Sequence, residues 1–267
     1  MTSPNDVSHL ARIEAELRRL GSRERAEGAK RYLKSELTFI GNDTRTVREV
    51  ARGVLREAAP LNRAGLLALV RDLWRRGIFE LRAVAVELLK AGSTVLVSGD
   101  HRLIERLIRD SQTWAFVDFL SIQVAGPLVV RFPELGPVLD RWAVDSDFWV
   151  RRAAMLALLL PLRCGAGDFE RFARYADGML EEKEFFIRKA IGWVLRETGK
   201  QRPQLVNAWL APRICRASGV TVREAVRYLP QARREALTAA HRARRSAALP
   251  AARAAASRRL PARRKVG

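Results

Sequence analysis

Apolar residues recur at three- and four-residue intervals along almost the whole chain, and this period constrains the fold more than any other feature of the sequence. Such spacing predicts amphipathic α-helices, whereas no segment alternates convincingly at the two-residue period of a β-strand. We therefore expect an all-α protein. The expected helices cover residues 7–20, 22–36, 44–58, 62–76, 79–90, 101–111, 113–132, 135–144, 147–162, 168–180, 182–198, 203–210 and 221–245.

A short sequence pattern recurs within these helices. Residues 148–154 (FWVRRAA) match residues 185–191 (FFIRKAI), which lie 37 residues later, and residues 79–85 (FELRAVA) fit the same template. An aliphatic residue followed by an arginine and small residues resembles the second helix of a HEAT repeat. A period of this size is one helical hairpin, and stacked hairpins form solenoids. The chain is therefore expected to be an α-solenoid of HEAT-like repeats.

The charge of the chain indicates its partner. It has 49 lysines and arginines against 29 aspartates and glutamates, a net charge of +20. Such an excess attracts polyanions, chiefly nucleic acid, or an anionic membrane surface. A GC-rich genome would explain the preference for arginine over lysine, but it would not explain the shortage of acidic residues. Nucleic acid is the partner that this composition favours.

Several classes of protein are disfavoured. The cysteines and histidines have no metal-ligand spacing and no disulfide framework, so we expect neither a metal nor a cofactor. Residues 1–20 are polar and charged, unlike a signal peptide, and the apolar stretch 153–162 is too short for a membrane span. We expect a cytoplasmic protein without membrane association. The cysteines and histidines are Cys164, Cys215, His9, His101 and His241.

The composition changes near the C-terminus and suggests a division of the chain. Residues 236–267 contain nine basic residues and no acidic one, and Pro250 and Pro261 are expected to break any helix there. We expect a repeat domain over residues 1–235 and a largely disordered, basic extension rich in Ala, Pro and Arg over residues 236–267. Without the extension, residues 1–235 retain a net charge of +11.

One carboxylate stands out in an apolar segment. Asp118 is the only charged residue between positions 113 and 130, and the i, i+4 spacing places it on one helix face with Trp114. A carboxylate in such surroundings is costly unless it is paired or lies in a cleft. Two interpretations follow: a buried Asp118 paired with an arginine of a neighbouring helix, or a functional carboxylate.

Two sets of cations accompany aromatic residues. Lys189, Trp193 and Arg196 share one helix face, and an indole between cations suits a base or sugar beside a phosphate backbone. Arg152 aligns with Lys189 one repeat later, so successive repeats would present cations along one surface. The alternatives are a core tryptophan with solvated charges around it, and a merely solvated charged face.

Four blocks of sequence, in order, carry a resemblance to a known family. The chain resembles the DNA alkylation repair glycosylases of the AlkD type over roughly residues 8 to 235, and the helix around Trp193 is the most specific part. The blocks are residues 31–34 through 39–41, 114–118, 148–154 and 183–197.

The resemblance implies a HEAT-like solenoid whose concave, basic surface holds duplex DNA. Family members hydrolyse the N-glycosidic bond of cationic N3- and N7-alkylated purines in base excision repair, and they are thought to act without base flipping. We expect a monomer that needs no cofactor and associates with the nucleoid through DNA. The implied catalytic residues are Asp118, Trp114 and Trp193. The expected DNA-binding residues are Arg152, near a backbone phosphate, Tyr32, which lines the same cleft, and Lys189, Arg196 and Arg188.

The chain departs from the family pattern at two positions. Ala115 replaces the first Asp of the pattern Trp-Asp-x-Val-Asp, which is expected to alter local packing or substrate range, and Arg45 stands where proline is common. The alternative to a glycosylase is a non-catalytic HEAT-repeat scaffold or DNA-binding protein. A membrane-surface protein is disfavoured because residues 236–267 contain no aromatic anchor.

Overall fold

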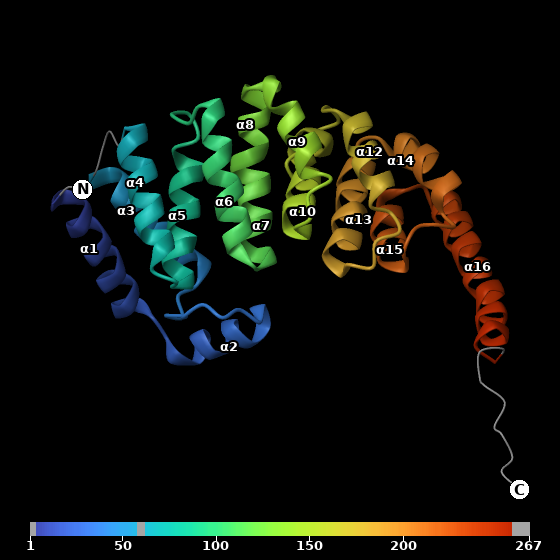
Figure 1. Ribbon diagram of the computed structural model, residues 1–267, viewed down its shortest axis with the longest axis horizontal. Coiled ribbons are helices and arrows are strands. Elements are labelled where there is room, and N and C mark those ends of the chain that lie inside the picture. The colour runs from blue at the N-terminus through green and yellow to red at the C-terminus, as the bar shows by residue number, and fades with distance from the viewer. Residues whose placement is uncertain (1–3, 58–61, 258–267) are drawn as a thin grey trace, which may run out of the picture. The chain divides into compact units, whose positions relative to one another are not determined.

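The computed structural model describes residues 4–57 and 62–257, and these residues form helices joined by short loops and turns (Figure 1). Within these ranges the only β pairing is an isolated bridge between Thr38 and Ile78. The all-α prediction is therefore confirmed.

The contacts divide the chain into two compact units, Met1–Ala157 and Leu158–Gly267. The boundary between them lies after residue 157 and does not test a division at position 235, so the predicted repeat domain and extension stay a prediction. The helices of the first unit are α1 (Pro4–Leu20), α2 (Arg23–Leu33), α3 (Thr44–Glu57), α4 (Arg63–Arg75), α5 (Phe79–Ala91), α6 (His101–Ser111), α7 (Trp114–Leu120), α8 (Gly126–Arg131), α9 (Gly136–Trp142) and α10 (Phe148–Leu156).

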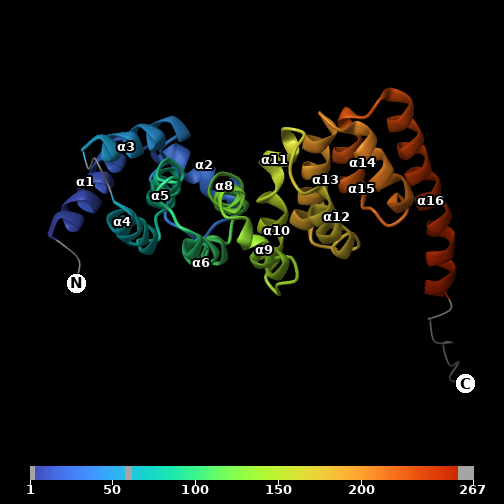
Figure 2. The ribbon, with the colours of Figure 1, turned by 90° about the horizontal axis from the view of Figure 1, so that it is seen from above.

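The second unit is built around α13, which packs against α11, α14 and α15 (Figure 2). Ile187, Ala190, Ile191, Val194 and Leu195 of α13 are fully buried. The helices of this unit are α11 (Leu159–Arg163), α12 (Phe169–Gly178), α13 (Phe185–Gly199), α14 (Pro203–Leu210), α15 (Gly219–Ala225) and α16 (Gln231–Ser257).

The predicted sequence repeat corresponds to a repeated structural element. Phe79, Phe148 and Phe185, the first residues of the three matching segments, are the first residues of α5, α10 and α13. The chain is therefore a helical-repeat protein, in which the recurring pattern marks the start of one helix in each copy.

The arginine of the pattern also has a recurring role. Arg82 donates a hydrogen bond from Nε to the carbonyl of Trp74. Arg151 donates to the carbonyls of Asp145 and Ser146. In the third copy, Arg188 Nε donates to the carbonyl of Glu182 at 2.6 Å. Each arginine thus satisfies a backbone acceptor just before its own helix, where the chain leaves the preceding element.

Two helices that the sequence predicts as continuous are interrupted. The segment 147–162 forms α10 and α11 because Pro161 cannot continue the helical hydrogen-bond pattern and its ring clashes with the preceding turn. The segment 221–245 contains Pro230, and the chain accordingly ends α15 at Ala225 and begins α16 at Gln231.

The C-terminal helix is longer than expected. It runs to Ser257 and includes Pro250, so the prediction that Pro250 ends the helix is wrong. The surrounding residues are mostly alanine, which has the highest intrinsic helix propensity and favours helix on both sides of the proline. Residues 258–267, the remainder of the predicted extension, lie outside the described residues.

The segment Trp114–Arg131 is one helix in which the π-helical turn Ser121–Ala125 joins α7 to α8. It is the one helix, among those described, that is long and apolar enough to cross a membrane, and half of it is buried inside the protein. It packs against α5, α6 and α10, which accounts for its apolar character. At its C-terminal end, Arg131 donates hydrogen bonds to the carbonyls of Ser93, Thr94 and Leu96.

The loop between α2 and α3 is held by one buried carboxylate. Glu80, at the start of α5, is 2% exposed and accepts hydrogen bonds from the backbone N–H groups of Ile40 at 2.9 Å and Gly41 at 2.7 Å. Gly41 has φ of +91°, and a Cβ there would lie 1.9 Å from the carbonyl oxygen of Ser22. The glycine and the carboxylate together fix how α2 leaves the body of the first unit.

Replacing Glu80 with alanine should lower the free energy of unfolding by about 3 kcal/mol, because it leaves buried backbone donors without a charged acceptor. Urea denaturation followed by circular dichroism measures the change. Glu49→Ala serves as the control, since Glu49 belongs to an exposed pair with Arg45 and should leave stability within measurement error. Equal effects of the two substitutions would contradict this role of Glu80.

Candidate functional site

An aromatic cluster fixes the first turn of α7. Phe116 packs against Trp74 and Phe79, with ring centroids 5.5 Å and 4.6 Å away, and Phe79 stacks on Phe39. Because the buried Phe116 faces this cluster, Trp114 and Asp118 lie on another side of the helix and are only partly buried. The helix therefore presents an indole and a carboxylate one turn apart.

Asp118 forms a two-pronged ion pair with Arg152 of α10. Arg152 Nε donates to Oδ1 at 2.7 Å, and Nη2 donates to Oδ2 at 2.8 Å. The side chain of Arg152 is 3% exposed and that of Asp118 is 14% exposed. The carboxylate is thus paired with an arginine of a neighbouring helix, as one interpretation of the sequence predicts, and that arginine is itself one of the predicted site residues.

Tyr32 extends this arrangement from a third helix. Its ring meets the indole of Trp114 edge to face, with centroids 5.9 Å apart and an interplanar angle of 88°. Tyr32 lies near the end of α2 and is 73% exposed. The first unit therefore brings four predicted site residues together. Tyr32 contacts Trp114, Trp114 lies one helical turn from Asp118, and Asp118 is paired with Arg152. A fixed anionic group beside electron-rich rings suits a cationic ligand.

Ala115 lies next to this group and lines a cavity of about 180 Å³ together with Phe79, Phe116 and Phe119. An aspartate at position 115 would place a second carboxylate in this cavity, which Glu87 also lines. The structure gives no account of Arg45 beyond its exposed pair with Glu49.

In the second unit, the predicted cations of α13 converge on one carboxylate. Lys189 Nζ donates to Oε1 of Glu224, and Arg196 Nη1 donates to Oε2 of the same residue. Trp193, which stands between the two cations in sequence, is partly buried. Lys189 and Arg196 are therefore neither a purely solvated face nor unpaired phosphate ligands, because Glu224 of α15 balances part of their charge.

Close packing of α13 on α15 makes this arrangement possible. A Cβ at Gly192 would lie 2.7 Å from Cβ of Glu224 and 3.0 Å from the carbonyl oxygen of Thr221. Any side chain at Gly192 would push the two helices apart. Burial alone would raise the pKa of Glu224, but the hydrogen bond from Lys189 and the charge of Arg196 outweigh it and hold that pKa below its usual value.

The sequence interpretation missed Glu224 and Gly192. Glu224 is the only acidic residue between Glu197 and Glu235, a stretch that contains many cations. A lone carboxylate in such a stretch predicts a shared ion-pair partner, by the same reasoning that singled out Asp118. No comparable sequence signal marks Gly192, because its importance arises only when two helices come into contact.

The described part of the chain contains no group of three or more His, Cys, Asp or Glu side chains placed to hold a metal ion. Cys164 and Cys215 are exposed and do not form a disulfide.

Glu224→Gln should destabilise the second unit at neutral pH, since it weakens the acceptor shared by Lys189 and Arg196. A lowered folded-state pKa contributes stability that is present at neutral pH and lost as pH falls through that pKa. The difference in melting temperature between the variant and the wild type should therefore shrink below about pH 4. Thermal unfolding at several pH values measures it. Glu181→Gln, at a 69% exposed side chain, is the control, and a difference that is independent of pH would contradict the prediction.

Comparison with solved structures reveals relatives of the fold. A predicted DNA alkylation repair enzyme from Enterococcus faecalis aligns with a TM-score of 0.72 and 21% identity over 79% of this chain and 97% of its own. AlkD2 from Streptococcus mutans aligns with a TM-score of 0.52 and 18% identity over 84% of this chain and 99% of its own. A second protein, from Streptococcus mutans UA159, aligns with a TM-score of 0.54 and 18% identity over 69% of this chain and 94% of its own.

Sequence comparison identifies a family for this chain but no individual curated relative. No curated protein sequence matches the chain. The family model described as DNA alkylation repair enzyme matches residues 13–229, which include both units' candidate residues. The predicted resemblance is thus confirmed, and the family implies DNA as the partner. The chain belongs to the DNA alkylation repair enzyme family.

Proposed function

We propose that this protein is a DNA glycosylase that hydrolyses the N-glycosidic bond of cationic N3- and N7-alkylated purines in duplex DNA. The observation that supports this most directly is the carboxylate of Asp118, held by Arg152 one helical turn from Trp114. Membership of a DNA repair family and the net charge of +20 favour the same substrate.

The chemistry requires few groups. An alkylated purine already carries a positive charge, so it leaves with the electron pair of the N-glycosidic bond and becomes neutral without a general acid. Positive charge then develops on the sugar, as in other glycoside hydrolyses, and a nearby carboxylate stabilises it. A water molecule adds to C1′ of the sugar and releases a proton. In this proposal Asp118 stabilises the sugar and orients the water.

Arg152 acts in this proposal as a positioning residue. A burial of 97% of its side chain and two hydrogen bonds to Asp118 favour that role over the direct phosphate contact that the resemblance implies. Each carboxylate oxygen has two acceptor directions, so one remains for the substrate when the guanidinium uses the other. The arginine keeps Asp118 oriented while leaving it able to face a cationic sugar.

The aromatic residues provide the surroundings of the nucleotide. Trp114 and the exposed Tyr32 offer electron-rich faces to a cationic nucleotide. For Trp193 we propose a contact of its indole with the same DNA. Glycosylases that flip bases use an enclosing pocket; action without flipping fits a site that includes a tyrosine 73% exposed. We also propose that the protein is monomeric and cytoplasmic and that it associates with the nucleoid through DNA.

A non-catalytic DNA-binding function is the second candidate, and one observation favours it. Both oxygens of Asp118 are engaged by Arg152, which is also what a purely structural ion pair requires. A scaffold would use the cationic surface without any chemistry at Asp118. The two candidates differ in whether free bases are produced.

The wild-type protein should release 3-methyladenine or 7-methylguanine from methylated duplex DNA, and Asp118→Asn should lower the rate by about 100- to 1000-fold. Asparagine retains one oxygen for Arg152 but loses the negative charge that the sugar needs. Chromatography of the released bases measures the rate, and fluorescence anisotropy measures DNA affinity, which should be retained. Asp110→Asn, at an exposed position, is the matched control.

Equal release by the wild type and Asp118→Asn would remove Asp118 from the proposed role. Tight DNA binding by the wild type without release of any base would contradict the glycosylase and leave the non-catalytic binder.

A further inference from the structure

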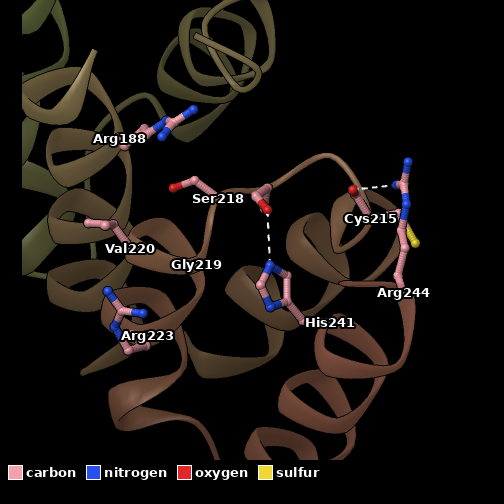
Figure 3. A pocket seen from close by; sticks show the side chains of 9 residues that line it. Arg188, Cys215, Ser218, Gly219, Val220, Arg223, His241 and Arg244 are labelled. Atoms are coloured by element: carbon pink, nitrogen blue, oxygen red, sulfur yellow. Dashed lines mark hydrogen bonds between the residues drawn. The ribbon is translucent and has the colours of Figure 1, made fainter. Parts of the chain in front are cut away.

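Two adjoining cavities lie between α15 and α16 in the second unit. The first, of about 490 Å³, is lined by Arg188, Arg223, His241 and Arg244 together with the segment 217–220 (Figure 3). The second, of about 580 Å³, is lined by Arg223, Arg234, His241 and Arg242 among others. Gly219, Arg223 and His241 line both cavities, so the two lie side by side, and we call them together the α15–α16 groove.

The α15–α16 groove is strongly cationic. Among the residues whose side chains are described, five arginines line it, and the one carboxylate is that of Glu235, which already accepts a hydrogen bond from Gln231 at 2.9 Å. Glu224, the acidic residue of α15, is occupied by Lys189 and Arg196. Arg223 is exposed and forms no ion pair with any residue of the described ranges. Its charge is therefore available to an external anion.

Hydrogen bonds to backbone carbonyls hold the walls of the groove. Arg188 donates from Nε to Glu182, and Arg244 donates from Nη1 to Cys215. His241 Nε2 lies 3.2 Å from the carbonyl oxygen of Ala217, and because a carbonyl only accepts, Nε2 carries the hydrogen. Figure 3 shows the ring of His241 reaching from α16 towards this carbonyl. These bonds hold three of the side chains that line the groove, one on α13 and two on α16.

Part of the groove lies beyond the region that defines the family. The family model matches the chain as far as residue 229. Arg234, His241, Arg242 and Arg244 come after that point, on α16. One wall of the groove is therefore a feature of this chain that membership of the family does not supply.

We propose that the α15–α16 groove binds consecutive backbone phosphates of a DNA strand. Guanidinium groups form charge-assisted, two-pronged hydrogen bonds with phosphate oxygens. Two adjoining cavities, each lined by arginines, fit a chain of phosphates better than one small anion. This inference rests on the proposed function, because it assumes a DNA substrate, and it assigns to α16 a contact with that DNA outside the region of Asp118.

The test uses the full-length protein and unmodified, fluorescein-labelled duplex DNA, with anisotropy recorded over a series of salt concentrations. Arg223→Gln and Arg234→Gln should each weaken binding about eightfold near 0.1 M salt and reduce the slope of log affinity against log salt by about 0.9. Arg227→Gln is the matched control, since Arg227 is exposed and lines neither cavity. Circular dichroism melting verifies that the variants fold.

Salt slopes of Arg223→Gln and Arg234→Gln that equal that of Arg227→Gln would overturn the inference. A site for small anions would also overturn it. In that case inorganic pyrophosphate raises the melting temperature of the wild type, and Arg223→Gln abolishes this increase but leaves the affinity for DNA unchanged. Base release from methylated DNA by the wild type is measured in parallel. If the wild type releases bases but the salt slopes of the groove variants are unchanged, only the proposed DNA contact of the groove is rejected. If the salt slopes change but no base is released, only the proposed glycosylase function is rejected.

Discussion

The candidate site depends on an ion pair between one carboxylate of an apolar helix and an arginine of the neighbouring helix. Asp118 lies in a segment that is otherwise free of charge from position 113 to 130, and burial of an unpaired carboxylate there would be strongly unfavourable. Arg152 makes the position acceptable by binding both oxygens from the adjacent helix. The same contact fixes where the carboxylate points, so the stability of the first unit and the geometry of the proposed chemistry have a common origin.

Cations outnumber carboxylates in this chain, and three of the carboxylates join separate elements of the fold. Glu80 orders the loop that carries α2 and therefore Tyr32, Asp118 pairs α7 with α10, and Glu224 gathers two cations of α13 onto α15. Elsewhere the excess of arginine is left facing outwards, as in the α15–α16 groove. A protein of net charge +20 thus uses some of its acids for internal order and retains an excess of cations for a polyanionic partner.

Much of the fold could be predicted from the sequence, because helical periodicity and a repeated pattern are local signals. The matching phenylalanines at positions 79, 148 and 185 begin three helices as expected. The helices predicted over 147–162 and 221–245 are interrupted in the structure because Pro161 and Pro230 lie within them, whereas the helix that includes Pro250 continues. For the site, spacing alone placed Trp114 with Asp118. The pairing of Asp118 with Arg152 and the dependence of α13 on Gly192 required knowledge of which helices touch, which no local pattern contains.

The π-helical turn Ser121–Ala125 has a consequence for how the first unit tolerates change. A π turn takes up one residue more than an α turn, and each residue of a helix advances the direction of the side chains by about 100°. On one side of the turn Asp118 must meet Arg152, and on the other Arg131 must reach the carbonyls of residues 93–96. The extra residue therefore sets the rotational phase between two anchored ends. A deletion of a single residue there would force one anchor out of alignment even though every interacting side chain was still present.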